Sequence, residues 1–198
     1  MENRIKQVAE SLPGCKPENR KAMSLIRFAD DLVILHKDLA VIQRCQQIIS
    51  EWLSEVGLEL QPSKTRISHT LNRYENNIGF EFLGFTVRQF PVGKYHSGKS
   101  SSGKLLGFKT LITPSKMKLK AHMQKIGKLI DGHKSVPQSD LIAHLNPVIR
   151  GWTSYYSGVV SSRIFNLADS TLFSQPKAWA EHRHPNKSSW WSCPKYWQ

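Results

Sequence analysis

Apolar residues in the first part of the chain change their spacing as the chain proceeds. Residues 1–12 place them at helical spacing, and Pro13 and Gly14 end the expected helix. After a polar connector, the run LIRFADDLVILH is apolar almost throughout, which is typical of buried β-strands. We therefore expect two short buried strands, at residues 24–28 and 32–36, joined as a hairpin with two aspartates at its tip.

Helical spacing returns after this hairpin. The apolar positions that share one helical face are Leu39, Ile42, Cys45, Ile49, Trp52, Leu53 and Val56. Asp38 is placed to cap the start of the helix, and Gly57 is placed to end it. A helix of this kind covers one face of a hairpin, so this part of the chain predicts an α+β layer.

The middle of the chain has mainly strand patterns. Short extended pieces surround a turn at Pro62–Ser63, and residues 80–90 are rich in the aromatic and β-branched side chains that favour a strand. Residues 93–112 indicate a hairpin with a long, flexible, basic tip. The strand pattern then stops, because Thr113 can cap a helix and Pro114 fits its first position.

The remaining residues have helical patterns. The first helix gathers four apolar side chains on one face, namely Leu119, Met123, Ile126 and Ile130. A second helix is expected at residues 139–156, kinked or restarted at Pro147, and a third at residues 162–173. Three helices with short links predict a small bundle.

Positive charge is concentrated in the second part of the chain. The protein holds 28 Lys and Arg against 15 Asp and Glu, a net charge of +13. Residues 1–69 contribute +1 (10 basic and 9 acidic), whereas residues 70–198 contribute +12 (18 basic and 6 acidic). This excess points to a polyanionic partner, either nucleic acid or an anionic membrane face. The three cysteines form no zinc or disulfide pattern, and no apolar run approaches a membrane span of about 18 residues.

Three interpretations stay open for Asp30 and Asp31. The pair can belong to a hairpin turn, because aspartate tolerates turn geometry, or it can lie exposed at a strand end. A third interpretation is a Mg²⁺ site, because Mg²⁺ takes hard oxygen ligands, usually one or two carboxylates together with substrate phosphates. Burial without any partner is excluded by its cost.

Five blocks in order resemble the group II intron reverse transcriptases, which are also called maturases. IRFADDLVIL resembles their Tyr-Ala-Asp-Asp block, with Phe28 at the tyrosine position. GLELQPSKTRISHT and GFEFLGFTVRQF are similar to the next two blocks of the palm subdomain. LNPVIRGWTSYYSGVVS and RHPNKSSWWSCPKYW are similar to the thumb, or maturase domain, and to the stretch that follows it.

The resemblance implies an α+β fold and a division into three parts. Residues 1–112 correspond to a partial palm with its antiparallel hairpin and covering helix, and residues 113–175 to a helical thumb or maturase bundle. Residues 176–198 correspond to a basic aromatic tail. The family's leucine- and arginine-rich helix is replaced by FSQPKAWAEH, in which Gln175–Pro176 predicts a helix break.

The resemblance also assigns catalytic roles. It implies that Asp30 binds catalytic Mg²⁺, that Asp31 assists, and that Lys64 lies near the phosphates of the incoming nucleotide. An ordinary turn lysine is the alternative for Lys64. The sequence FLGF resembles the region that grips the primer end, although plain strand core also explains Phe82 and Leu83.

The maturase domain contacts intron RNA in this family, and the implied contacts are mainly cations. The expected nucleic-acid-binding residues are Lys109, Lys116, Lys118, Lys120, Lys125, Arg150, Tyr156, Arg183, Lys187 and Lys195. For Trp152 and Tyr155 we expect the bundle core instead. The expected partners are group II intron RNA and an RNA/DNA template–primer, and no membrane.

The resemblance implies an RNA-directed DNA polymerase with part of its site missing. The family's fingers and first palm strand, which carries another metal-binding aspartate, precede the first matching block, and Met1 falls at an internal position of the pattern. We therefore expect an incomplete Mg²⁺ site and an isolated chain that is inactive unless a front-half chain supplies the rest. A non-catalytic RNA-binding module that assists splicing and a decayed remnant are the alternatives. The expected location is cytoplasmic, with nucleoid association open.

Overall fold

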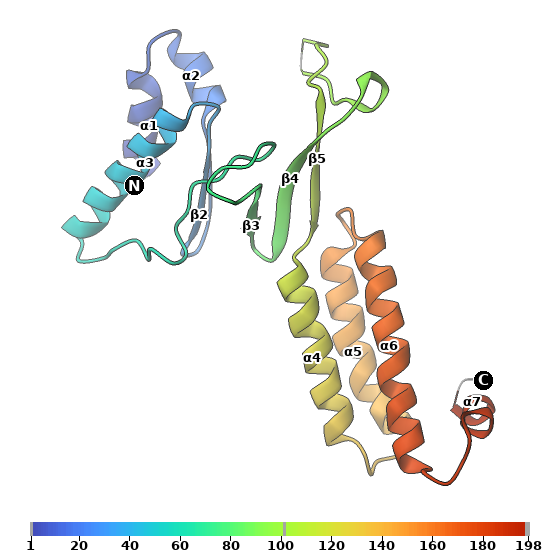
Figure 1. Cartoon of the computed structure of the whole chain (residues 1–198). Helices are drawn as coiled ribbons and strands as arrows, with labels where there is room; N and C mark the ends of the chain where they lie inside the picture. Colours follow the sequence, from blue (N-terminus) through green and yellow to red (C-terminus); the bar gives the residue numbers. More distant parts are fainter. Residues whose placement is uncertain (1, 101, 197–198) are drawn as a thin grey trace. The chain divides into compact units, whose positions relative to one another are not determined.

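A computed structural model of the protein describes residues 2–100 and 102–196. The chain divides after Ile78 into two compact units, which are described separately below. Both units mix helices with antiparallel strands (Figure 1), which confirms the expected α+β class. Among the described helices, none combines the length and the apolar character that crossing a bilayer requires.

The first unit consists of three helices and one hairpin. Its elements are α1 (Glu2–Ser11), α2 (Lys16–Ala22), β1 (Ser24–Phe28), β2 (Asp31–Leu35) and α3 (Leu39–Glu55). The polar connector expected before the first strand is wrong, because α2 occupies it. The carbonyl of Cys15 accepts hydrogen bonds from the backbone N–H groups of Glu18 (3.0 Å) and Asn19 (3.0 Å), so this short polar segment closes a helical turn.

Helices α1 and α3 cover one face of the β1–β2 hairpin. Their buried residues are Ile5, Val8, Val41, Cys45 and Ile49, and the strand residues Leu25, Leu32 and Ile34 pack against them. Asp38 caps α3 as expected, because its Oδ1 accepts a hydrogen bond from the N–H of Ala40 at 3.0 Å. The other face of the hairpin exposes Ile26 by 45% and Phe28 by 62%. The strands are therefore only partly buried, on the face toward the helices, and not fully buried as expected.

The second unit begins with a three-stranded antiparallel sheet in the order β3–β4–β5. Its strands are β3 (Phe80–Phe82), β4 (Phe85–Pro91) and β5 (Phe108–Pro114). The single strand expected at residues 80–90 is wrong, because Leu83 and Gly84 form a turn between β3 and β4. Their φ angles are +50° and +83°, and two consecutive positive values are typical of the tightest hairpin turns.

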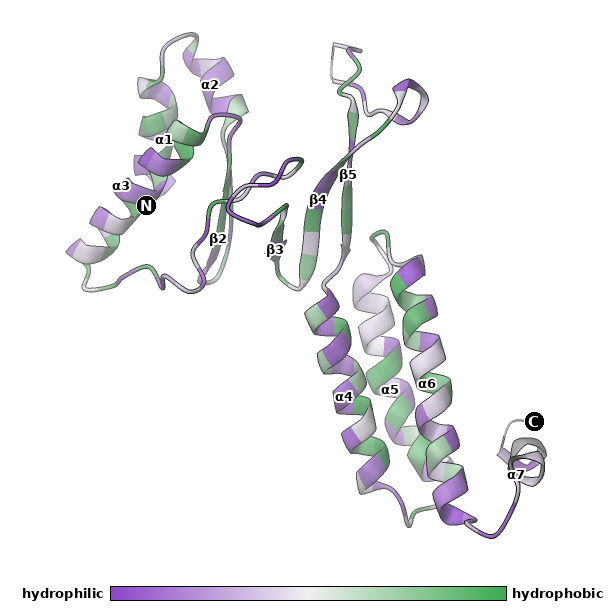
Figure 2. Cartoon of the chain, in the orientation of Figure 1, coloured by the Kyte–Doolittle hydropathy of each residue, from purple (hydrophilic) through white to green (hydrophobic). Residues whose placement is uncertain are grey.

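A three-helix bundle follows the sheet. Its helices are α4 (Lys116–Gly132), α5 (Gln138–Tyr156) and α6 (Ser162–Arg183), and α7 (Ser189–Tyr196) comes after them. Hydrophobic and hydrophilic residues alternate along the bundle helices (Figure 2). The buried core is formed by Leu119, Met123, Ile126, Ile130, Leu141, Leu145, Ala168, Trp179 and Ala180. Ser115 precedes α4, so the cap expected at Thr113 is wrong and Pro114 ends β5 instead.

Helix α6 continues through Pro176, so the break predicted there is wrong. The side-chain amide of Gln175 donates to the carbonyl of Met123 at 3.3 Å, and the indole N–H of Trp179 donates to the carbonyl of His133 at 2.9 Å. These two bonds hold α6 to α4 and its following loop on both sides of the proline. The domain boundary expected at residue 175 lies inside this helix.

Candidate nucleic-acid interface

Asp30 and Asp31 lie at the tip of the β1–β2 hairpin. Phe28 pairs directly with Asp31, so Ala29 and Asp30 form the turn between the strands. Both aspartates are exposed. Two of the interpretations left open by the sequence are therefore true together, since Asp30 is a turn residue and Asp31 begins a strand. Solvent hydrates both carboxylates, and neither has the energetic cost of burial.

The backbone of this tip is strained at Ala29. Its φ angle is +50°, in the left-handed region that residues with a Cβ rarely adopt. That conformation costs roughly 1–2 kcal/mol for an ordinary L-residue. Such strain persists where the surrounding structure enforces it, and it is common at functional turns. Here the β1–β2 pairing, which extends to Phe28 and Asp31, enforces it.

The two carboxylates fit one part of a Mg²⁺ site. They are hard oxygen donors, and two protein carboxylates are what Mg²⁺ takes when substrate phosphates supply further ligands. Within the described residues there is no group of three or more His, Cys, Asp or Glu side chains able to hold a metal ion. A centre with two metal ions needs carboxylates from more than one segment. The pair therefore fits a shared site and not a self-sufficient one.

Lys64 lies on the turn that follows α3. Its backbone N–H donates to the carbonyl of Gln61 at 3.0 Å, and that of Thr65 donates to the same carbonyl at 2.9 Å. The Lys64 side chain is exposed, and over the described residues no hydrogen bond or ion pair joins it to Asp30 or Asp31. Its role toward the nucleotide phosphates stays a prediction.

The β3–β4 turn in the second unit is fixed to the helices. The hydroxyl of Tyr155 donates to the carbonyl of Leu83 at 2.9 Å, and the hydroxyl of Tyr156 donates to the carbonyl of Gly84 at 3.3 Å. The backbone N–H of Ser115 also donates to the carbonyl of Gly84, at 2.9 Å. The FLGF segment, which resembles a primer-gripping region, is thus tied to the end of α5 and the start of α4.

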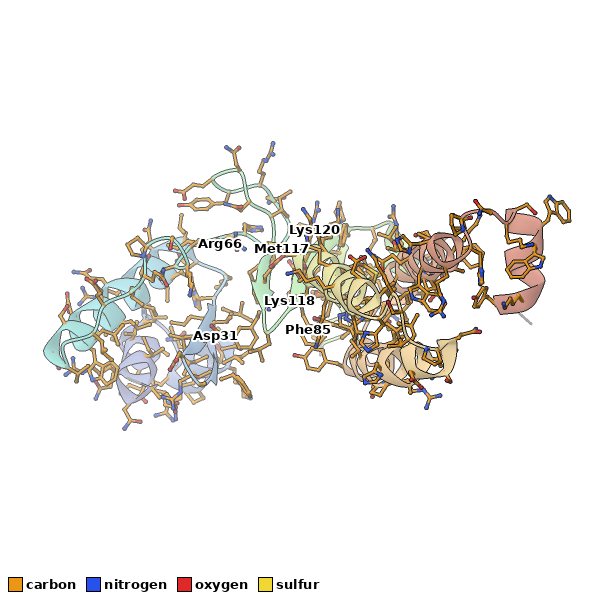
Figure 3. All side chains as sticks on the ribbon, turned by 90° about the horizontal axis from the view of Figure 1, so that it is seen from below. Asp31, Arg66, Phe85, Met117, Lys118 and Lys120 are labelled. Carbon is orange, nitrogen blue, oxygen red and sulfur yellow. The ribbon has the colours of Figure 1, made fainter. Side chains whose placement is uncertain are left out.

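Only glycine fits at the second position of this turn. A Cβ atom on Gly84 would lie 2.8 Å from the hydroxyl oxygen of Tyr156 and 3.3 Å from Cγ of Lys118. The ring of Phe85 completes the contact, stacking on Tyr155 at 5.2 Å and meeting the edge of Tyr156 at 5.1 Å. In Figure 3, Phe85 lies beside the start of α4, whose first two turns carry Met117, Lys118 and Lys120.

The two adjacent tyrosines differ from expectation in how far their side chains are buried. Tyr156, predicted to contact RNA, is only 4% exposed and has little surface to offer, whereas Tyr155, expected in the core, is 55% exposed. Tyr156 packs against Phe85 and against Trp152, whose ring lies 5.0 Å away. Burial raises the pKa of Tyr156, and the nearby Tyr155 raises it further. Trp152 packs against the bundle core, as expected.

The segment that forms β4, β5 and most of α4 carries many basic residues and no acidic ones. Residues 82–130 contain ten Lys and Arg and no Asp or Glu. Five of the ten were predicted to bind nucleic acid, and all five are exposed: Lys109 on β5 and Lys116, Lys118, Lys120 and Lys125 on α4. In the described part of the chain none of the five forms an ion pair. Their charge is therefore uncompensated and open to a polyanion.

Of the two predicted arginines, one is exposed and the other is partly buried. Arg150 is exposed on α5. The guanidinium of Arg183 donates to the carbonyls of Val136 and Lys134 and lies 5.0 Å from the centre of the Trp179 ring. Arg183 therefore fastens the end of α6 to the loop between α4 and α5, so we expect it to support the interface by holding this loop.

The last helix presents cations beside aromatic rings. Lys187 and Lys195 lie over the ring of Trp191, at 5.6 Å and 4.6 Å from its centre. The helix is anchored by a 2.7 Å hydrogen bond between Nε2 of His184 and the hydroxyl of Tyr196. Partial burial lowers the pKa of His184, and the nearby Lys195, Arg183 and Lys187 lower it further.

Trp190 is a residue of this surface that sequence reasoning did not assign. Its side chain is 90% exposed, and it is the sequence neighbour of Trp191, over whose ring the two lysines lie. The signal that could have found it is the pair of adjacent tryptophans in a basic segment, and the structure exposes both of them, Trp190 by 90% and Trp191 by 38%. An exposed indole among cations suits stacking on a nucleotide base.

Comparison with known proteins gives two matches that together span most of the chain. Residues 2–109, more than half of the chain, match the family model for reverse transcriptase (RNA-dependent DNA polymerase). Residues 119–197 match the family model for the group II intron maturase-specific domain. No curated protein matches the chain. The first match contains the Ala-Asp-Asp hairpin, and the second contains most of the bundle and α7.

Proposed function

Because the chain belongs to the reverse transcriptases and carries the maturase-specific domain of group II introns, we propose that it binds intron RNA together with a template–primer. We further propose that Asp30 and Asp31 take part in nucleotidyl transfer there. The observation that carries the RNA-binding part is the uncompensated charge of residues 82–130, which hold ten cations and no acidic residue. Such a surface gains free energy from releasing the counterions of a polyanion.

The contacts with RNA divide by chemistry. The exposed lysines of β5 and α4 suit phosphate groups, because a lysine ammonium acts as a point charge without a fixed fork geometry. Lys187, Lys195 and the exposed Trp190 suit an unpaired segment, where a base can stack on the indole while cations lie near its phosphates. Arg150 adds a further cation on α5, which is exposed as well.

The proposed catalytic part uses the hairpin tip. Reverse transcriptases use a divalent metal, and Asp30 and Asp31 are the residues here that would hold Mg²⁺. When bound, Mg²⁺ neutralises charge on the nucleotide phosphates. Asp30 and Asp31 orient toward solvent at the turn, and Lys64 supplies a further positive charge for the triphosphate. Because the described residues contain no third ligand near the pair, we propose that transfer needs a carboxylate from outside residues 1–198.

The test separates binding from catalysis. The double variant Asp30→Asn, Asp31→Asn should keep full affinity for group II intron RNA, because neither residue belongs to the cationic surface. It should lose primer extension when the remaining palm is supplied, on a longer polypeptide or as a second chain. It should also lose Mn²⁺ binding in the presence of nucleotide, measured by electron paramagnetic resonance. Asp169→Asn, an exposed change on α6, is the matched control and should alter none of these.

One observation favours a second function, RNA binding without catalysis. It is the absence, within the described residues, of any further carboxylate able to complete a metal site with Asp30 and Asp31. Under this function the chain binds intron RNA, and the wild-type protein extends no primer even when the remaining palm is present and folded. Primer extension in that mixture would rule out this second function.

A further inference from the structure

The β4–β5 hairpin ends in a hydrogen-bonded tip, here defined by its described residues 92–100 and 102–107. At its base the N–H of Val92 donates to the carbonyl of Gly107 at 3.0 Å, and the N–H of Gly98 donates to the carbonyl of Phe108 at 3.1 Å. The N–H of Leu106 donates to the carbonyl of Gly98 at 2.9 Å. The sequence suggested a flexible tip, but these bonds give it a defined shape.

Serine side chains complete the hydrogen bonding of the tip. The Oγ atom of Ser97 accepts a hydrogen bond from the N–H of Gly107 at 2.8 Å. The Oγ atom of Ser100 accepts one from the N–H of Lys104 at 3.1 Å, and the N–H of Ser100 donates to the carbonyl of Lys104 at 2.8 Å. These backbone groups are therefore already hydrogen-bonded within the tip. A binding partner would contact the side chains of the tip and not its backbone.

Tyr95 projects from this frame. It lies in the short 3₁₀ turn Lys94–His96 and is 93% exposed, and among the described residues no ring or cation lies against it. The same tip carries the exposed cations Lys94, Lys99 and Lys104. No acidic residue occurs between Glu81 and Asp131 to offset them. An exposed ring and cations on the same tip offer a stacking face together with positive charge.

We propose that this tip binds an unpaired segment of RNA, with a base stacked on Tyr95 and the flanking phosphates near the lysines. A stacking face together with cations is the combination by which proteins hold single strands, since every base offers a face and every nucleotide a phosphate. A regular duplex keeps its bases stacked inside and offers only phosphates, so it would leave Tyr95 unused. An acidic protein surface would also leave the ring without a matching partner.

This inference rests on the proposed RNA binding and adds to it a separate site with its own specificity. The predicted contacts of α4 and α5 need no particular RNA structure, whereas the tip, like the exposed Trp190 of α7, suits unpaired nucleotides. The exposed position of Tyr95 makes it suitable for mutation, because its removal breaks no contact that holds the hairpin together.

The first experiment compares two RNA probes at one salt concentration, a stem–loop with an unpaired loop and a blunt duplex of equal length. Tyr95→Ala should weaken binding of the stem–loop about tenfold and leave binding of the duplex unchanged. Tyr95→Phe keeps the stacking face, so it should bind both probes as the wild type does. Both variants should melt at the wild-type temperature.

The second experiment reads the stacking directly. A 2-aminopurine placed in the unpaired loop loses fluorescence when it stacks on an aromatic ring. The wild type and Tyr95→Phe should quench it, and Tyr95→Ala should not, at protein concentrations that saturate the RNA. Lys94→Gln with Lys104→Gln should weaken binding of the stem–loop and make it less salt-dependent. The matched pair Lys16→Gln with Lys21→Gln, on α2, removes the same charge and should have little effect.

The outcomes distinguish the inference about Tyr95 and its tip from the proposed RNA binding by the whole chain. Binding of the stem–loop that is unaffected by Tyr95→Ala would overturn the inference and leave the proposed RNA binding intact. Equal weakening of stem–loop and duplex would overturn the preference for unpaired RNA. Displacement of the stem–loop by polyglutamate, with affinity for polyglutamate itself lost in Tyr95→Ala, would assign the tip to an acidic protein. A wild-type chain that binds neither RNA probe would refute the proposed function, and the inference with it.

Discussion

The hydroxyl of Tyr156 donates a hydrogen bond to the carbonyl of Gly84, 3.3 Å away, although the two residues are 72 positions apart in the chain. The same glycine has a φ of +83° and no room for a side chain. The contact joins the turn of the sheet to the end of α5, so within the second unit the position of the FLGF turn depends on the bundle.

Replacing this glycine should destabilise the second unit more than backbone strain alone does. Gly84→Ala forces a residue with a Cβ into the left-handed region and brings that atom to 2.8 Å from the Tyr156 hydroxyl. We expect a loss of about 2–4 kcal/mol in the free energy of unfolding, measured with urea. Gly103→Ala is the control, because Gly103 has a φ of +79° and no atom within 4 Å of the added Cβ. It should cost only about 1 kcal/mol.

The partner of this contact allows a second check. Tyr156→Phe removes the oxygen atom with which the new Cβ collides. If the account is correct, Gly84→Ala should cost less in the Tyr156→Phe background than in the wild type, as a double-mutant cycle measures. An equal cost in both backgrounds would show that Tyr156 does not restrict this position.

His122 should make the stability of the second unit depend on pH. It is buried against Trp152, with ring centres 4.6 Å apart, and its Nε2 atom has no partner within the described residues. Burial lowers the pKa of His122, and Lys125 lowers it further. A lowered pKa in the folded state means that protonation favours unfolding. The contribution of His122 is therefore complete above its unfolded pKa of about 6.5 and is lost as pH falls below that value.

A phenylalanine tests this contribution. His122→Phe keeps a flat ring beside Trp152 and removes the titrating group, so the free energy of unfolding should change less between pH 7 and pH 5 than in the wild type. His144→Gln removes an exposed histidine of α5 and is the control, which should retain the wild-type pH dependence. A wild-type slope retained in His122→Phe would assign the pH dependence to other groups.

The pattern of apolar residues predicted most of the fold. Strand β1 and helix α3 with its Asp38 cap follow from local spacing and capping, and the structure confirms them, whereas α5 continues through Pro147 without restarting there. The family resemblance and the α+β class are confirmed as well. These features depend on residues that are close in sequence, so local rules describe them adequately.

The errors have a common physical cause, which is tertiary contact. Pro176 looks like a helix breaker, yet Gln175 and Trp179 bond to α4 and its following loop and hold α6 continuous. Tyr155 and Tyr156 are adjacent on α5 and both contact Phe85, and Tyr156, which also packs against Trp152, is the buried one. The turn at Leu83 needs a positive φ in a residue other than glycine, which local propensity does not predict.

The sequence predicted which residue types the candidate site contains but not which side chains the fold exposes. Asp30, Asp31 and Lys64 were selected because they match the family pattern, and their catalytic roles stay predictions. Tyr95 could not be selected from the sequence, because an aromatic residue is equally typical of a core, and Trp190 was marked only by the adjacent tryptophans of a basic segment. Their exposure is a property of the folded chain.

Relaxing the strain at the hairpin tip should stabilise the first unit. Ala29 has a φ of +50°, which glycine adopts without a steric penalty. Ala29→Gly should raise the free energy of unfolding by up to about 1 kcal/mol, since relief of strain exceeds the entropy that glycine adds to the unfolded chain. Ala121→Gly, on the exposed face of α4, should lower it by about 1 kcal/mol. A destabilised Ala29→Gly would contradict a strained tip.

Arg183 and Lys195 should respond in opposite ways to loss of charge. Arg183→Gln removes donors to the carbonyls of Val136 and Lys134, so thermal denaturation should show a lower melting temperature. Lys195→Gln should leave the melting temperature nearly unchanged and weaken RNA binding, because its ammonium lies only over aromatic rings. A stable Arg183→Gln protein with reduced RNA affinity would make Arg183 a direct RNA contact.

The salt dependence of binding to group II intron RNA tests the central claim most directly. We predict that the logarithm of the association constant falls steeply with the logarithm of salt concentration, as expected for roughly 6–10 neutralised phosphates. Changing Lys116, Lys118, Lys120 and Lys125 to glutamine should reduce this slope by about one unit per lysine and leave the melting temperature nearly unchanged. A shallow slope in the wild type, or the same slope in a folded lysine variant, would contradict the claim that this uncompensated surface binds RNA.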